Sequence, residues 1–223
     1  MENNFTELVF ILDQSGSMVY LTDDTINGYN TFLEKMRPDN EHQVLLTTVL
    51  FNTYYQILHD RVDLKEVRPL TNMDYQPCGG TALLDSVGKT ILRIHEKRLS
   101  QEPSQAPKKV LMVINTDGLE NASREFSYAQ VRTMIQTRKE FGWEFIFLGA
   151  NMNAVQEASR FGIDAKRAQT FHADRRGVKS VYHGLAKSIN LYRCSKNFVL
   201  QDDWNCDIND DFQNRSCDMD KDV

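Results

Sequence analysis

Three oxygen-bearing side chains, Asp13, Ser15 and Ser17, alternate along a short segment that follows an apolar run. Gly16 separates the two serines and lets the backbone turn sharply, so the three side chains could converge on one spot. Carboxylate and hydroxyl oxygens are hard ligands that suit Mg²⁺ first, with Mn²⁺ or Ca²⁺ also possible. Ser and Asp are also the usual residues at the start of a helix, so this cluster alone leaves a helix cap and a cation site open.

Two further segments carry matching oxygen ligands. Thr81 follows a pair of glycines at the head of a predicted helix, and Asp117 ends a second apolar run. If the two apolar runs are neighbouring parallel strands, all three loops meet at the carboxyl edge of the sheet, where open α/β sheets bind ligands. The sequence therefore predicts one metal site made by Asp13, Ser15, Ser17, Thr81 and Asp117.

These motifs, DxSxS followed by Thr and then Asp, resemble the metal-ion-dependent adhesion site (MIDAS) of von Willebrand factor A domains, in the same order and at similar separations. The resemblance covers about residues 5–195. It implies a Rossmann-like domain in which Ser15, Ser17 and Thr81 can bind Mg²⁺ directly, while Asp13 and Asp117 act directly or through water. It also implies an open coordination position that an Asp or Glu of a protein partner fills.

The remaining sequence predicts the elements that would position this site. Apolar runs predict strands, and apolar residues at helical spacing predict the helices between them. Such alternation favours a doubly wound, mostly parallel six-stranded α/β sheet with one antiparallel edge strand and helices on both faces. We expect strands over 6–13, 43–52, 53–61, 109–117, 143–150 and 168–173, and helices over 22–37, 81–99, 127–141, 153–163 and 177–193.

Other chemistry-bearing patterns fail on their spacing. Gly88, Lys89 and Thr90 imitate the end of a phosphate-binding loop, but Leu83 stands where that motif needs Gly. A dehalogenase-type phosphotransferase would need a second Asp where Ser15 stands, and no histidine lies in a metal-binding or hydrolase pattern. Asp85 and Glu120 could support the metal site, or act as a helix-start charge and a solvated loop charge.

Composition and charge limit the partners. The net charge is −5, and residues 202–223 hold eight Asp, no Glu, one Arg and one Lys, which leaves the rest of the chain near +1. We therefore expect no nucleic-acid partner, because a basic face is lacking. No apolar run approaches the roughly 20 residues of a membrane span, and no secretion signal is evident, so we expect a cytoplasmic protein without membrane contact. Four widely spaced cysteines suggest reduced thiols more than a zinc site.

The predicted domain spans residues 1–195, followed by an acidic tail over residues 196–223 that is ordered only if it docks. A tail Asp could bind the chain's own metal or that of a neighbouring copy, which would give self-association; a solvated tail is the simpler interpretation.

The leading hypothesis is a non-enzymatic, Mg²⁺-dependent protein interaction module, similar to stand-alone intracellular domains of bacteria or phages. Two alternatives stay open. One is a hydrolase that uses a metal-bound water, for which no general base is evident, and the other is a structural domain without metal.

Overall fold

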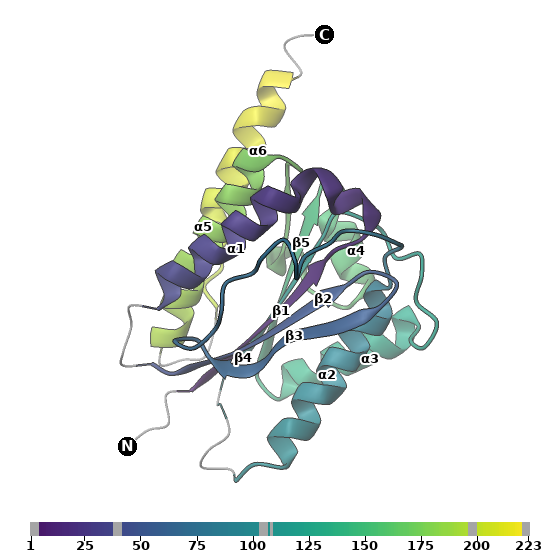
Figure 1. The fold of residues 1–223 in the computed structure, drawn as a ribbon, viewed down its shortest axis with the longest axis vertical. Helices are drawn as coiled ribbons and strands as arrows, with labels where there is room; N and C mark the ends of the chain where they lie inside the picture. Colours follow the sequence, from purple (N-terminus) through teal and green to yellow (C-terminus); the bar gives the residue numbers. More distant parts are fainter. Residues whose placement is uncertain (1–4, 38–41, 103–106, 108, 196–199, 220–223) are drawn as a thin grey trace.

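The apolar run that ends at Asp13 forms a strand in which every residue is buried, β1 (Thr6–Asp13), at the centre of the molecule. Its side chains alternate between two apolar layers, because successive residues of a strand point to opposite faces. The computed structural model describes residues 5–37, 42–102, 107, 109–195 and 200–219. Within these ranges the chain folds into one sheet flanked by helices (Figure 1).

The sheet has six strands in the order β3-β2-β1-β4-β5-β6. Four strands run parallel to β1 or to a strand parallel to it, and β3 pairs antiparallel with β2 at one edge. This arrangement confirms the predicted fold class. The strands after β1 are β2 (Val44–Phe51), β3 (Tyr55–Asp63), β4 (Lys109–Thr116), β5 (Trp143–Ala150) and β6 (Ala168–Phe171).

The helices lie on both faces of the sheet, as the alternation of elements predicted. One apolar layer joins α1, α5 and α6 to the sheet, and the other joins α2, α3 and α4. The helices are η1 (Gly16–Leu21), α1 (Thr22–Met36), α2 (Leu83–Leu99), α3 (Tyr128–Glu140), α4 (Ala154–Arg160), η2 (Ala165–Arg167), α5 (Arg175–Cys194) and α6 (Cys206–Met219), where η1 and η2 are short 3-10 helices. None of the helices in the described ranges is both long enough and apolar enough to cross a membrane.

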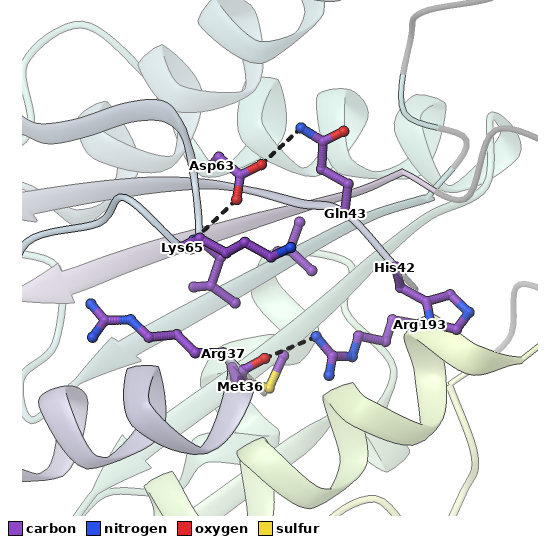
Figure 2. Close-up of a pocket in the computed structure, with 9 residues that line it drawn as sticks. Met36, Arg37, His42, Gln43, Asp63, Lys65 and Arg193 are labelled. Carbon is purple, nitrogen blue, oxygen red and sulfur yellow. Dashed lines mark hydrogen bonds between the residues drawn. The ribbon is translucent and has the colours of Figure 1, made fainter. Parts of the chain in front are cut away.

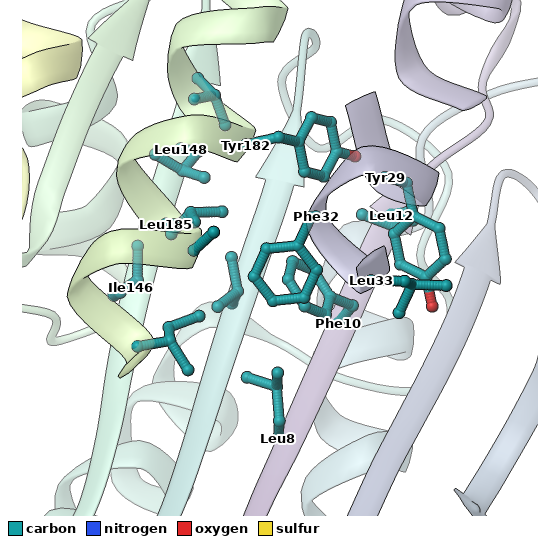
Figure 3. Close-up of a cluster of buried hydrophobic side chains, with 14 of the residues drawn as sticks. Leu8, Phe10, Leu12, Tyr29, Phe32, Leu33, Ile146, Leu148, Tyr182 and Leu185 are labelled. Carbon is teal, nitrogen blue, oxygen red and sulfur yellow. The ribbon is translucent and has the colours of Figure 1, made fainter. Parts of the chain in front are cut away.

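Aromatic side chains fill the layer between β1, α1 and α5 (Figure 3). Phe10 of β1 meets Tyr29 and Phe32 of α1 edge-on, with ring centroids 5.7 Å and 5.0 Å apart. Gly28 lets Tyr182 of α5 approach α1, since a Cβ at this position would lie 2.3 Å from the Tyr182 ring. Any larger residue at position 28 would therefore push the two helices apart.

The acidic C-terminal segment contains a helix, α6, that packs against α5 and β6. Ile208 and the preceding Trp204 are buried, and the Trp204 indole donates a hydrogen bond to the Lys166 carbonyl at 2.7 Å. Ion pairs join the helix to α5, with Arg176 and Asp211 at 2.6 Å. Residues 200–219 are thus docked. The predicted boundary after residue 195 adjoins residues 196–199, which lie outside the described residues, and it stays a prediction.

Candidate metal centre

The site predicted from the sequence lies where β1 and β4 end side by side. Leu12 pairs with Asn115 in the parallel register, so the loops that follow the two strands leave the sheet next to each other. On the other side of β1, Asp13 pairs with Phe51 at the end of β2. The carboxyl edge therefore brings together the loops that begin at Asp13, Phe51 and Thr116.

The Asp13 carboxylate is buried and held from both sides. Its Oδ1 accepts a hydrogen bond from the Ser15 backbone N–H at 2.7 Å, and its Oδ2 accepts one from the Thr116 hydroxyl at 2.5 Å. Only 1% of Asp13 is exposed. The carboxylate is thus fixed in position by its own loop and by the last residue of β4.

A chain of short contacts links Asp13's loop to Asp117. The Ser15 and Ser17 hydroxyls lie 3.2 Å apart, and the Ser17 hydroxyl donates to Asp117 Oδ1 at 2.6 Å. Ser15 is buried whereas Ser17 is exposed, so the chain leads from the interior to the surface. The structure therefore links four of the five predicted residues in one series of contacts, from Asp13 through Ser15 and Ser17 to Asp117.

Thr81, the fifth predicted residue, lies beside the Asp117 loop. A Cβ at Gly118 would lie 3.2 Å from the Thr81 hydroxyl and 3.9 Å from the Ser17 hydroxyl, so both oxygens face the same point of the loop. Asn121 fixes the Thr81 backbone, because its side chain accepts from the Thr81 N–H at 2.8 Å and its own N–H donates to the Thr81 carbonyl at 3.1 Å. All five predicted side chains thus gather at one edge of the sheet.

The segment between β3 and α2, which has no regular secondary structure, clamps the Asp13 loop. The Tyr75 hydroxyl, which is buried, donates to the Asp13 carbonyl. Cys78 N–H donates to the Gln14 carbonyl at 2.9 Å, and Gly16 N–H donates to the Gly79 carbonyl at 3.0 Å. Gly79 has φ +72°, a conformation that favours glycine. The clamp therefore fixes the backbone from which Asp13, Ser15 and Ser17 extend.

Asp85 and Glu120 each hold backbone N–H groups and are not solvated charges. Asp85 accepts from the N–H groups of residues 124–126 at 2.9 Å, and Glu120 accepts from Leu84 N–H at 2.8 Å and Ser123 N–H at 2.7 Å. Burial alone would raise the pKa of Asp85, but these donors keep it below its usual value. The two carboxylates bind the Asp117 loop to the start of α2.

The carboxylates of Asp13 and Asp117 accept fewer hydrogen bonds than those of Asp85 and Glu120, and no cation in the described chain balances them. Within the part of the chain that the structure describes, neither forms an ion pair with a Lys, Arg or His side chain. Burial raises the pKa of Asp13 to about 6, although hydrogen bonds from Thr116 and Ser15 lower it. Burial also raises the pKa of Asp117, although a hydrogen bond from Ser17 lowers it. Two partly dehydrated carboxylates without a counter-charge are what a cation-binding site requires.

The set of donor atoms fits a hard cation and not a soft one. Three hydroxyls and two carboxylates offer only oxygen, and Mg²⁺, Mn²⁺ and Ca²⁺ prefer such ligands. Among the described residues, no group of three or more His, Cys, Asp or Glu side chains could hold a metal. A site here would therefore depend on the hydroxyls of Ser15, Ser17 and Thr81 as well as on the two carboxylates.

The cavity of about 280 Å³ shown in Figure 2 lies at the opposite edge of the sheet. Arg193, near the end of α5, donates to the Met36 carbonyl at 3.1 Å, and Gln43 donates to Asp63 at 2.9 Å. The side chains here hold the ends of helices and strands together. The cavity is lined by Met36, Arg37, His42, Gln43, Val44, Asp63, Leu64, Lys65 and Arg193, none of which belongs to the predicted site.

The other sequence patterns have structural roles. Gly88, Lys89 and Thr90 lie within α2, where Lys89 pairs with Glu125 at 2.6 Å and a Cβ at Gly88 would strike the Phe126 ring. The four cysteines are free and exposed.

No family model and no curated protein sequence matches the chain. Among solved structures, it is similar to the vWF domain of the type V pili tip protein Mfa5 from Porphyromonas gingivalis, with a TM-score of 0.61 and 12% identity over 83% of this chain and 95% of that one. It is also similar to proximal thread matrix protein 1 from the mussel byssus, whose MIDAS motif is occupied by zinc in one structure. There the TM-score is 0.53, with 13% identity over 82% of this chain and 45% of that one.

A third similar structure is that of the manganese-loaded TRAP protein of Plasmodium vivax, with a TM-score of 0.51 and 15% identity over 82% of this chain and 74% of that one. The chain spans less than half the length of the mussel protein. At these identities the likeness shows a shared fold.

Proposed function

Since the chain has the von Willebrand factor A fold that its motifs predicted, we propose that it is a non-enzymatic, Mg²⁺-dependent protein interaction module. Asp13, Ser15, Ser17, Thr81 and Asp117 would hold the cation at the carboxyl edge of the sheet. The observation that carries the proposal is the pair of carboxylates, Asp13 buried and Asp117 half-buried, that share an edge with three hydroxyls and have no cationic partner among the described residues.

The ligand set supports binding of a partner's carboxylate more than chemistry. A bound divalent cation would supply a positive centre that two carboxylates and three neutral hydroxyls leave open to one more anionic oxygen. The hydrogen bonds of the Asp13, Ser15, Ser17 and Asp117 side chains go to one another, to the Ser15 amide and to Thr116, and in the described chain none goes to a His or Lys that could act as a general base. We therefore infer a partner that presents an Asp or Glu.

The related structures support a divalent cation without deciding which one, because manganese and zinc are named for two of them. Mg²⁺ is our choice because all five ligands are oxygen atoms, with Mn²⁺ or Ca²⁺ as the nearest substitutes. A cytoplasmic location, a stand-alone bacterial or phage origin and self-association through the acidic tail stay predictions from the sequence.

The test uses Mn²⁺ as a spectroscopic substitute for Mg²⁺. Titration of the protein with Mn²⁺, followed by water proton relaxation, reports both binding and the water that remains on the ion. We expect tight binding that Mg²⁺ competes away, and a fall in relaxation enhancement when acetate is added, because a carboxylate replaces bound water. Acetamide, which is neutral, is the matched control and should have no effect. Absence of Mn²⁺ binding, or an equal response to acetamide, would contradict the proposal.

A further inference from the structure

Large exposed apolar side chains gather around the candidate metal centre. Of the ten in the described part of the chain, five lie in the segments that form this edge or lead to it. Four of them define what we call the apolar rim: Tyr20, Tyr54, Met73 and Leu119, which are 93%, 79%, 82% and 56% exposed. Single exposed apolar residues are ordinary on a protein surface, but a group of them marks a place of interaction.

Contacts of neighbouring residues place the rim around the site. Tyr20 lies in the 3-10 helix that begins at Gly16, and Leu119 directly follows Gly118. Tyr54 directly follows Thr53, whose hydroxyl accepts from Gly80 N–H at 2.9 Å, one residue before Thr81.

Met73 belongs to the segment that clamps the Asp13 loop, two residues before Tyr75. Tyr20, Tyr54 and Leu119 therefore come from three segments next to the oxygen-bearing side chains, and Met73 lies further out, on the segment that leads to the clamp.

Three further acidic side chains near this edge, Asp74, Asp85 and Glu120, are already engaged within the protein. Asp74, next to Met73, forms a two-pronged ion pair with Arg68 at 2.7 and 2.8 Å. Asp85 and Glu120 are occupied by backbone N–H groups, as described above. The edge thus offers a partner apolar contacts around one site that, with metal bound, would attract an anion. Centres of protein interfaces show the same composition, rich in Tyr and Met and poor in charge.

We propose that the apolar rim docks a protein segment in which one Asp or Glu is flanked by bulky apolar residues. The inference rests on the proposed function, because the carboxylate needs the metal, and it adds the chemistry of the flanking residues. Charge complementarity selects this occupant: one carboxylate matches the metal, and further charges would meet apolar side chains. A segment rich in Asp or Glu would gain one such contact and lose hydration elsewhere.

Peptides of defined sequence test whether the residues beside the acidic residue matter. Two labelled peptides share a central Asp and differ only in the two residues on each side, Leu and Phe in one and Ser in the other. We expect the apolar peptide to bind at least about tenfold more tightly in Mg²⁺, measured by fluorescence polarisation, because it buries apolar surface on the rim. Its binding should vanish in EDTA or when Asn replaces the central Asp.

Variants locate the effect on the rim. Tyr20→Ser and Met73→Ser should lose most of the preference for the apolar peptide and keep their affinity for Mn²⁺. Leu99→Ser and Phe141→Ser are matched controls, because both residues are exposed but lie at the far ends of α2 and α3. Leu99 ends the seventeen-residue helix α2, whose length of about 25 Å separates it from the site. Both controls should behave as the original protein.

The outcomes distinguish the two proposals. Equal affinity for the two peptides, an unchanged preference in the rim variants, or no binding of any peptide at millimolar concentration would overturn the docking inference while Mn²⁺ binding stands. Absence of Mn²⁺ binding in the original protein, measured without peptide, would overturn the metal site itself.

Discussion

The two edges of the sheet treat their buried charges in opposite ways. At the carboxyl edge, Asp13 and Asp117 accept hydrogen bonds from hydroxyl and amide groups, and no cation balances them among the described residues. At the opposite edge, Glu7 at the start of β1 is fully buried and pairs with Arg61 at 2.7 Å. Lys109, at the start of β4, donates to the carbonyls of Tyr192, Arg193 and Ser195 near the end of α5.

The difference shows at which edge the charged side chains have partners within the fold and at which edge they lack a counter-charge. At the amino edge, Glu7 has the Arg61 counter-charge and Lys109 has three carbonyl acceptors, so they hold strands and helices together, although burial still raises the pKa of Glu7. The carboxylates at the other edge raise the free energy of the folded protein until something positive joins them. The same contrast directs the experiments below, in which a change at one edge should alter stability and a change at the other should alter binding.

The largest effect is expected from Glu7→Gln at the matched edge. Removing the carboxylate leaves the Arg61 guanidinium nearly buried without its counter-charge, which should lower the free energy of unfolding by about 3 to 5 kcal/mol. Urea denaturation measures this loss. Affinity for Mn²⁺ should stay as in the original protein, and a large loss of affinity would contradict the separation of the two edges.

Asp13→Asn should have the opposite pattern, a loss of Mn²⁺ affinity without a loss of stability. Mn²⁺ affinity should fall on the order of 100-fold or more, since even residues outside the ligand shell change metal affinity by 10- to 100-fold. Without metal, the variant should be more stable than the original protein. The difference between a pKa of about 6 and the ordinary 3.8 corresponds to about 3 kcal/mol of cost at neutral pH that Asn avoids.

Calorimetric titration with Mn²⁺ and urea denaturation in EDTA check the two halves of this prediction. An Asp13→Asn protein that is less stable in EDTA would show that the carboxylate is matched after all.

Acid should weaken metal binding through the same carboxylate. The folded-state pKa of Asp13 is raised, so without metal the destabilisation from its ionised form is complete above about pH 6 and is lost as the pH falls towards 4. Protons therefore compete with metal below about pH 6. We expect Mn²⁺ affinity to be about tenfold lower at pH 5 than at pH 7, measured by titration in one buffer system. Affinity that is constant over this range would contradict the assignment of Asp13.

The smallest effect is expected from Tyr75→Phe, which removes one hydrogen bond from the clamp. The Asp13 carbonyl then loses its donor, and Mn²⁺ affinity should fall by about three- to tenfold, in keeping with about 1 kcal/mol for a buried hydrogen bond. Tyr192→Phe is the matched control at the other edge, because the Tyr192 hydroxyl is buried without a hydrogen-bond partner in the described chain. It should leave affinity unchanged and leave stability unchanged or slightly higher.

Most of the sheet could be predicted because buried parallel strands are continuous apolar runs, and β1 and β4 are two of them. The site followed from residue types at strand ends, where the topology forces loops together. The sequence also predicted one antiparallel edge strand, which in the structure is β3.

The supports of the site could not be predicted in the same way. Tyr75 lies in an irregular segment without periodicity, and its contact with the Asp13 carbonyl joins positions 62 residues apart. Thr116 carried a weak signal, since it directly precedes Asp117 at the end of a strand and could have been expected to point at the site.

Helix α6 was also missed, because its many Asp residues obscured a short apolar pattern. Ile208 and Phe212 are four residues apart, which is one helical turn, and Ile208 is buried against the domain. One apolar pair at helical spacing, with Met219 as a third apolar residue seven positions later, is too little to outweigh a strongly acidic composition in a sequence pattern.

The hydrogen bonds that join residues 120–126 to the start of α2 affect how this loop can move. This loop has no regular secondary structure, yet its amide groups donate to the buried side chain of Asp85 and to the half-buried side chain of Glu120. Amide hydrogens there should exchange with solvent only when the first turn of α2 opens too, which makes loop and helix one cooperative unit. Thr81 and Asp117 would then move together or not at all, and their spacing would survive fluctuations of the surrounding surface.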